Sequence, residues 1–172
     1  NQHRNLIIVE KKAEFSIIIC DHTISPRKFL TNAVTEVYVG ESARFDLIRV
    51  QNEHNAACKV THTFIHQEKN SVASSNNMTL HGGLIRNSTY HYMGGERAET
   101  NSFGLYLTDK WQHVDNYVNV DHAFPNCTSN QLFKGVLDDM STGAFNGRIL
   151  VRPDAQGTLA YQKNNNILLT DD

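Results

Sequence analysis

One pattern, first met as Val37-Tyr38-Val39-Gly40-Glu41-Ser42-Ala43, returns along the chain. With one residue inserted it recurs as His91-Tyr92-Met93-Gly94-Gly95-Glu96-Arg97-Ala98, and more loosely as Val151-Arg152-Pro153-Asp154-Ala155. The alanines that close the three copies lie about 55 and about 57 residues apart. A strand, an acidic turn and a small residue that return in this way predict a solenoid, in which short strands close several coils before the pattern repeats.

Alternating apolar residues elsewhere predict further short strands. Asn is unusually common, and the run Asn164-Asn165-Asn166 suggests asparagines stacked on successive coils. Only Asn146-Gly147 offers the tight turn of a hairpin, which favours a parallel β-helix over a β-sandwich or jelly roll. The segment 130–140 is compatible with a helical turn or a strand. The groups expected to share a strand face are Phe15, Ile17 and Ile19; Ala43, Phe45 and Leu47; Phe103, Leu105 and Leu107; Val114, Val118 and Val120; and Phe145, Gly147, Ile149 and Val151.

Length and charge narrow the class of protein. A chain of 172 residues fits one domain with one core. The formal charge of −2, without a run of like charges, argues against a nucleic acid partner. The longest apolar runs, Leu6–Val9 and Ile17–Cys20, are far too short to span a bilayer, so we expect no membrane-spanning segment.

The three cysteines, Cys20, Cys58 and Cys127, are odd in number, widely spaced and without a CxxC pair. This spacing disfavours a disulfide framework or a zinc ribbon, and we expect a reducing cytoplasm. A nucleophilic pair of Cys127 with His122 or His113 is conceivable if the turn at Pro125 folds the thiol back. A buried, inert thiol is the simpler expectation.

A metal site is the main alternative function. His113-Val114-Asp115 is the first half of a two-histidine, one-carboxylate iron site, and His122 is the one histidine downstream that is able to complete it. These three residues support the hypothesis of a metal-dependent β-fold oxygenase. The competing interpretation is a polar strand. His62 and His66 are not expected to share an ion, because four strand residues separate them by about 13 Å.

The C-terminal two-thirds resembles the SufB/SufD family of iron–sulfur cluster assembly proteins, and its SufD branch more than its SufB branch. The residues that carry the resemblance are His113-Val114-Asp115-Asn116, Asp121-His122-Ala123, the run from Cys127 to Asp139, Phe145-Asn146-Gly147-Arg148-Ile149, Pro153-Asp154-Ala155-Gln156 and the run from Asn164 to Leu169. The match is clear from about Gly83 onward and weaker before it.

The resemblance implies a right-handed parallel β-helix and a role as a scaffold subunit rather than an enzyme. It implies pairing with SufB and with the SufC ATPase, an iron–sulfur cluster held only in the assembled complex, and a homodimer as a further possibility. The family's Cys-Ser-His-Gly stretch has no counterpart in this sequence, so no catalytic, cofactor-binding or metal-binding residue is carried over. We therefore expect residues 1–172 to form a single β-helix core domain without the helical regions that flank it in the family.

Overall fold

The computed structural model describes residues 1–23 and 27–170, and this part of the chain consists of strands joined by turns. It contains no helix, so none that is long and apolar enough to cross a bilayer. The strands are β1 (Gln2–Val9), β2 (Glu14–His22), β3 (Phe29–Val39), β4 (Arg44–Asn52), β5 (Ala57–Gln67), β6 (Val72–His81), β7 (Leu84–Met93), β8 (Glu99–Thr108), β9 (His113–His122), β10 (Thr128–Leu137), β11 (Thr142–Val151) and β12 (Leu159–Leu168).

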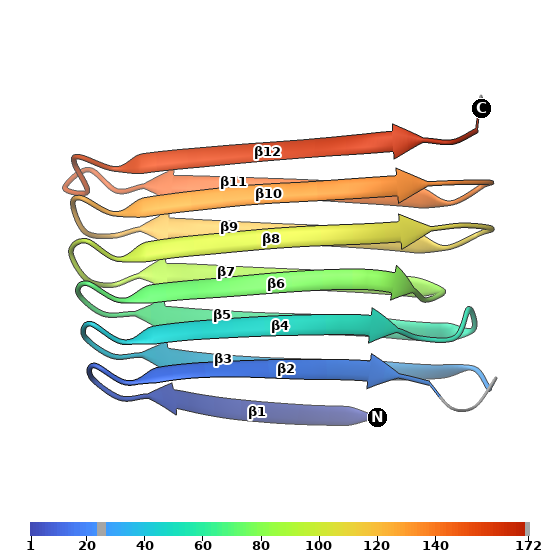
Figure 1. Cartoon of the computed structure of the whole chain (residues 1–172), viewed down its shortest axis with the longest axis horizontal. Coiled ribbons are helices and arrows are strands. Elements are labelled where there is room, and N and C mark those ends of the chain that lie inside the picture. Colours follow the sequence, from blue (N-terminus) through green and yellow to red (C-terminus); the bar gives the residue numbers. More distant parts are fainter. Residues whose placement is uncertain (24–26, 171–172) are drawn as a thin grey trace.

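The strands form two parallel sheets that face each other across a lumen. Sheet A has the order β1-β3-β5-β7-β9-β11, and sheet B has the order β12-β10-β8-β6-β4-β2. Each coil therefore contributes one strand to each sheet and advances the chain by about 26–31 residues. In Figure 1 the nearer, even-numbered strands run to the right and the farther ones to the left while the chain climbs, which is a right-handed coil. The predicted right-handed parallel β-helix is confirmed.

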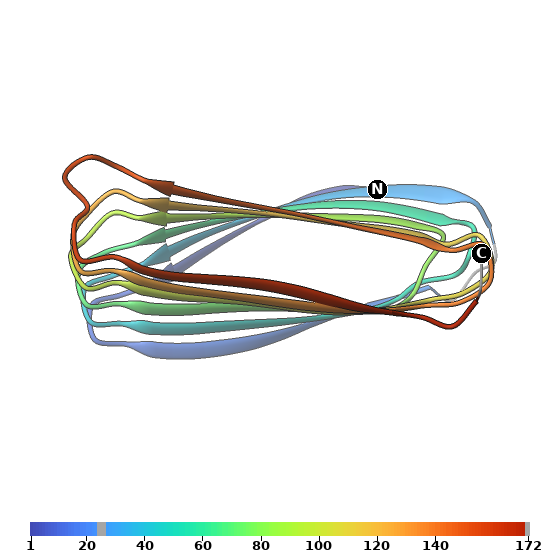
Figure 2. The same cartoon turned by 90° about the horizontal axis from the view of Figure 1, so that it is seen from above.

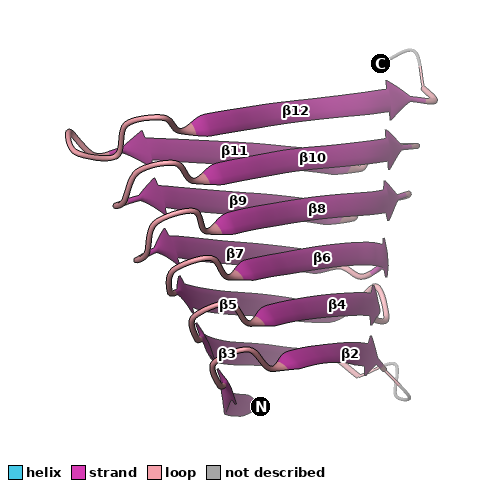
Figure 3. Cartoon of the chain, turned by 60° about the vertical axis from the view of Figure 1, so that its left-hand side comes forward, coloured by secondary structure: helices cyan, strands magenta, loops and turns pink. Residues whose placement is uncertain are grey.

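Seen from above, the coil is flattened into two long layers that meet at a turn on either side (Figure 2). Neighbouring coils are joined by backbone hydrogen bonds between parallel strands, and the turns also bond to one another, as from Lys12 N to Glu41 O at 3.0 Å. Because each pair of strands satisfies its backbone within the stack, the free strand edges among residues 1–23 and 27–170 lie at the first and last coils. The edge strands are β1 and β2 at one end and β11 and β12 at the other (Figure 3).

The turns that lead from sheet A to sheet B explain the sequence repeat. The first five of these six turns each place one residue in the left-handed region, with φ of about 60°, directly before a small residue that points inward. The period of 55–57 residues spans two coils, in agreement with the expectation that several coils close before the pattern repeats, and the turns between the alanine copies close on Ser71 and Cys127. The left-handed residues are Lys12, Ser42, Asn70, Arg97 and Asn126, and the small residues after them are Ala13, Ala43, Ser71, Ala98 and Cys127.

Side chains alternate between the lumen and the outer surface along every strand. The valines of β9 point into the lumen, and its residues His113, Asp115, Tyr117, Asn119 and Asp121 point out, as predicted. Phe103, Leu105 and Leu107 do share a face, but it is the outer face of sheet B. The segment 130–140, left open between helix and strand, lies largely in β10.

Candidate functional site

The three residues of the hypothetical iron site lie on opposite sides of sheet A. His113 and Asp115 are on the outer face, where His113 bonds Thr142 at 2.6 Å and Asp115 pairs with Arg86. His122 points into the lumen, is fully buried and bonds Ser129 Oγ through Nε2 at 2.9 Å. The backbone of sheet A therefore lies between the imidazoles of His113 and His122, so the three side chains cannot bind one metal ion. The hypothesis of an oxygenase that uses this site is wrong. Within residues 1–23 and 27–170, no cluster of three or more histidine, cysteine or acidic side chains is arranged to hold a metal ion.

Cys127 is also not part of a nucleophilic pair. Its thiol is buried at the corner of a coil, where it donates to the carbonyl oxygens of Gly95 at 3.4 Å and Pro125 at 3.6 Å. Burial raises the pKa of Cys127, with smaller opposing contributions from backbone hydrogen bonds. The thiol is thus held in its unreactive protonated form, in agreement with the simpler expectation.

His62 and His66 lie on the outer face of β5, as their spacing required. His66 is sandwiched between the rings of Tyr38 at 4.8 Å and Tyr92 at 5.1 Å, measured between ring centroids. Burial lowers the pKa of His66, and the nearby Glu68 partly opposes this shift. The histidine is therefore a member of an aromatic stack that follows the coil axis, rather than a metal ligand.

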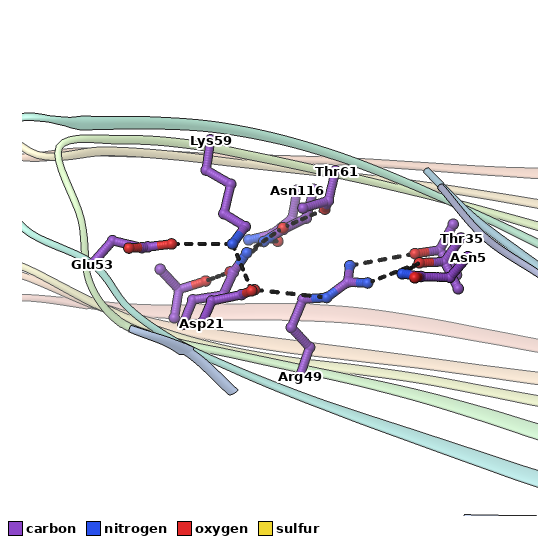
Figure 4. A network of polar contacts seen from close by, with 12 residues as sticks. Asn5, Asp21, Thr35, Arg49, Glu53, Lys59, Thr61 and Asn116 are labelled. Carbon is purple, nitrogen blue, oxygen red and sulfur yellow. Dashed lines mark hydrogen bonds and ion pairs between the residues drawn. The ribbon is translucent and has the colours of Figure 1, made fainter. Parts of the chain in front are cut away.

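The lumen of the first three coils contains a buried ionic network (Figure 4). Lys59 Nζ lies 2.6 Å from Asp21 Oδ1 and 3.0 Å from Glu53 Oε1, and Arg49 Nε lies 4.0 Å from the other oxygen of Asp21. Burial lowers the pKa of Arg49, and the Asp21 carboxylate opposes this shift. Two cations and two anions balance each other, so the network carries no net charge.

Farther along, the lumen is filled by neutral polar side chains. Asn87 bonds Gln51 at 2.9 Å, Thr61 at 2.8 Å and its register partner Asn116 at 3.2 Å. His91 is fully buried, bonds Ser75 Oγ at 3.2 Å and has its pKa lowered by burial to about 3, so it is neutral at physiological pH. These networks fix side-chain positions without introducing charge.

The end of the stack formed by β11 and β12 is open. All ten residues of β12 are exposed, including those that face the lumen. The lumen-facing residues of β12, identified by their register on β10, are Ala160, Gln162, Asn164, Asn166 and Leu168. Tyr106 reaches across the small Gly135 to donate to Asn166 Oδ1 at 2.6 Å. Gln131, the neighbour of Gln162 one coil below, has no hydrogen-bond partner for either amide atom within the described residues.

The opposite end, formed by β1 and β2, has a different character. The lumen side of β2 presents Phe15, Ile17 and Ile19, which rest on Phe45, Leu47 and Arg49 of the next coil. One end of the lumen is therefore largely apolar, and the other is lined by carboxamides. A right-handed parallel β-helix with a filled lumen belongs to the solenoid class of proteins, in which each coil contacts only its neighbours.

The comparisons with known proteins agree with this architecture. A family model described as SUF system FeS cluster assembly, SufBD core domain, matches residues 1–172. The chain therefore belongs to the SufBD family of the SUF system for iron–sulfur cluster assembly. No solved structure matches the chain significantly.

Relatives come from bacteria and a plant. An iron–sulfur cluster assembly SufBD family protein of Mycobacterium leprae is 34% identical over 110 residues, 60% of this chain and 28% of the relative. One of Synechocystis is 29% identical over 98% of this chain and 39% of the relative. The chloroplastic protein ABCI7 of Arabidopsis thaliana is 26% identical over 96% of this chain and 35% of the relative. The chain thus spans between 28% and 39% of the length of these relatives.

Two features of the lumen were not predicted from the sequence, although the alternation of side chains along the strands indicates both. Arg49 lies in phase with Phe45 and Leu47, which marks it as an inward-facing cation. The parity of His122 matches that of the inward valines and differs from that of His113. Asparagine stacking, expected at Asn164–Asn166, occurs instead where Asn130 donates to Asn101 at 3.0 Å and where Asn87 meets Asn116.

Proposed function

We propose that this chain is the β-helix core of a SufD-like scaffold subunit, which pairs with SufB and with the SufC ATPase to support iron–sulfur cluster assembly. In this proposal the subunit is not an enzyme: ATP hydrolysis belongs to the SufC partner, and the cluster is cargo of the assembled complex. The proposal also places the protein in the cytoplasm. Its main support is the family match over residues 1–172.

The open end at β11 and β12 is the proposed pairing surface. β12 has an unpaired strand edge, and such an edge presents free N–H and C=O groups that a strand of another subunit satisfies. The same coil exposes Gln162, Asn164 and Asn166 on its lumen side. A carboxamide both donates and accepts hydrogen bonds, so a partner coil with polar inward side chains would continue the lumen networks.

Pairing of β12 with a strand of SufB would bury these carboxamides, and a charge placed among them would then be expensive to desolvate. Without SufB, the same end is available for a second copy of the chain, which gives a homodimer. The expected order of preference is SufB first, because family members pair as unlike subunits in the resemblance described above.

The test compares two identical substitutions in neighbouring residues of β12. Asn164 faces the lumen beside Phe133, whereas Asn165 faces outward beside Lys134. Both side chains are exposed in the single chain, so neither Asn164→Asp nor Asn165→Asp should destabilise it. In the full-length protein, Asn164→Asp should weaken association with SufB at least tenfold by light scattering and sedimentation, and Asn165→Asp less than twofold.

Cluster reconstitution on the complex should follow the same order, because assembly depends on pairing. Equal effects of the two substitutions would contradict end-on pairing. A wild-type protein that remains monomeric and ignores SufB would contradict the scaffold role itself.

A further inference from the structure

The outer face of sheet B carries an apolar patch that is not explained by end-on pairing. We define the sheet B patch as Ile48, Met78, Phe103, Leu105 and Leu132, which come from the four successive strands β4, β6, β8 and β10. These side chains line a groove of about 430 Å³, and Phe103 is 38% exposed. Figure 1 looks onto this face, which is the layer of even-numbered strands.

Backbone chemistry restricts what is able to cover the patch. Each of the strands β4, β6, β8 and β10 is hydrogen-bonded to a neighbouring strand on both sides. These strands therefore have no free backbone groups that a docked segment could bind. A segment that docks on this face must therefore satisfy its own N–H and C=O groups. An α-helix does so internally, and an amphipathic helix is the usual cover for the apolar face of a sheet.

The size of the patch also suits a short helix. Together with Ile18 on β2, it crosses five strands, or about 19 Å at a strand spacing of about 4.8 Å. A helix of about 13 residues has this length at a rise of about 1.5 Å per residue.

The charges around the patch indicate which sign of charge a binding partner should carry. The strand positions in register with the patch residues carry two charged side chains within the described part of the chain, Lys134 and Lys163. Both are exposed, and neither has an ion pair there. On the outer face of sheet A, Arg4, Arg86 and Arg152 are each paired with a carboxylate, whereas Arg148 is exposed without an ion pair among the described residues. The lysines of the patch are thus available for carboxylates of a docked segment.

We propose that the sheet B patch binds an acidic amphipathic helix of a separate protein chain, with apolar side chains in the groove and carboxylates near Lys134 and Lys163. The choice of a separate chain rests on the proposed scaffold function, which requires surfaces for other components. Lys163 lies on β12, but on its outer face, whereas the proposed pairing uses the strand edge and the lumen side of β12, so one protein has room for both contacts.

The first experiment measures binding of a labelled 14-residue peptide to the full-length protein by fluorescence anisotropy. The peptide carries leucines at helical spacing (i, i+3, i+4, i+7) flanked by glutamates, since this spacing places them on one face. Replacement of the glutamates by lysines should weaken binding at least tenfold. A proline in the middle of the peptide should do the same, because it breaks the helix. Equal binding of the three peptides would overturn the proposal.

The second experiment changes the protein. Phe103→Arg should weaken binding at least tenfold, while Leu6→Arg on the exposed outer face of β1 should leave it unchanged. Lys134→Glu combined with Lys163→Glu should weaken the acidic peptide about fivefold and strengthen the lysine peptide. Arg148→Glu, an exposed charge reversal on sheet A, is the matched control. Effects at the control positions as large as those at the patch would overturn the proposal.

The third experiment asks whether the patch is free in the full-length protein. Cys20 is exposed and lies in register with Val50, beside the patch on the same outer face. Alkylation of Cys20, followed by mass spectrometry, should be fast in the free protein and several-fold slower with saturating peptide. A Cys20 already protected in the free protein would mean that the chain covers its own face, which overturns a partner in trans. Phe103→Arg should keep its association with SufB and Asn164→Asp its peptide binding, so the two proposals fail separately.

Discussion

The first three coils hold four charged side chains in their lumen, whereas the described lumen of the last three coils holds none. Asp21, Arg49, Glu53 and Lys59 balance each other within the N-terminal half. The C-terminal half relies on aromatic contacts and neutral polar groups, such as the stack of Phe133 on Phe145 with ring centroids 4.6 Å apart. The charged half is satisfied internally, while the neutral half retains free carboxamides at its open end. This difference indicates that the two halves are held together in different ways, the N-terminal half by a charged network and the C-terminal half by neutral contacts.

The largest loss of stability is expected from a substitution in the charged network of the N-terminal half. Lys59→Met removes the cation between two buried carboxylates. It leaves Glu53 without an ion pair and Asp21 with only the more distant Arg49. Such a loss typically lowers the free energy of unfolding by about 3–5 kcal/mol. Chemical denaturation of the variant checks this, with Lys69→Met in an exposed turn as the control that should change stability by less than about 0.5 kcal/mol. A loss below about 1 kcal/mol for Lys59→Met would show that the network is not a source of stability.

A somewhat smaller loss of stability is expected from a substitution in the lumen of the C-terminal half. Phe133 is fully buried and packs against Phe145 and over Gly104, where a Cβ atom would collide with its ring. Phe133→Ala should lower the free energy of unfolding by about 3 kcal/mol through lost burial and the cavity left behind. Phe124→Ala, in a turn where the ring is 43% exposed, is the matched control and should have less than a third of this effect. Similar losses for the two phenylalanines would mean that the lumen is poorly packed.

The pH dependence of stability sharpens the comparison further. Burial lowers the pKa of His91 to about 3 in the folded protein, while the unfolded chain binds a proton below about pH 6.5. Between these values the unfolded state holds more protons, so stability falls as the pH falls, by up to about 1.4 kcal/mol per pH unit. Burial also lowers the pKa of His122, which adds to the slope. Denaturation of the wild type and of His91→Gln at pH 7, 6 and 5 should show a shallower decline in the variant. Parallel curves would mean that His91 is protonated in the fold.

The fold was predictable because its signals are local. Turn residues and inward alanines mark the corners, and alternation marks the strand faces. The coil length was not predictable from the alanines, because Ser71 and Cys127 fill the same corner position with other small residues. Strand parity alone separates His113 from His122, so the failure of the iron site was already encoded in the sequence.

The partners within the lumen are a different matter. That Arg49 points inward follows from its phase, but its meeting with Asp21, and that of Lys59 with Glu53, depend on which strands stack and in which register. The stacking order and the register of the strands depend on the whole coil and cannot be predicted from any one segment. The same holds for the sheet B patch, because its five side chains belong to four strands that are far apart in the sequence.

Hydrogen exchange of the backbone amides tests end-on pairing most directly. In the full-length protein, the amides of β12 on the free strand edge should exchange quickly and become protected at least tenfold when SufB is added. Amides of β4, β6 and β8 should change little, because their hydrogen bonds are already made within sheet B. Protection confined to other parts of the molecule, with β12 still exchanging freely in the complex, would contradict the account.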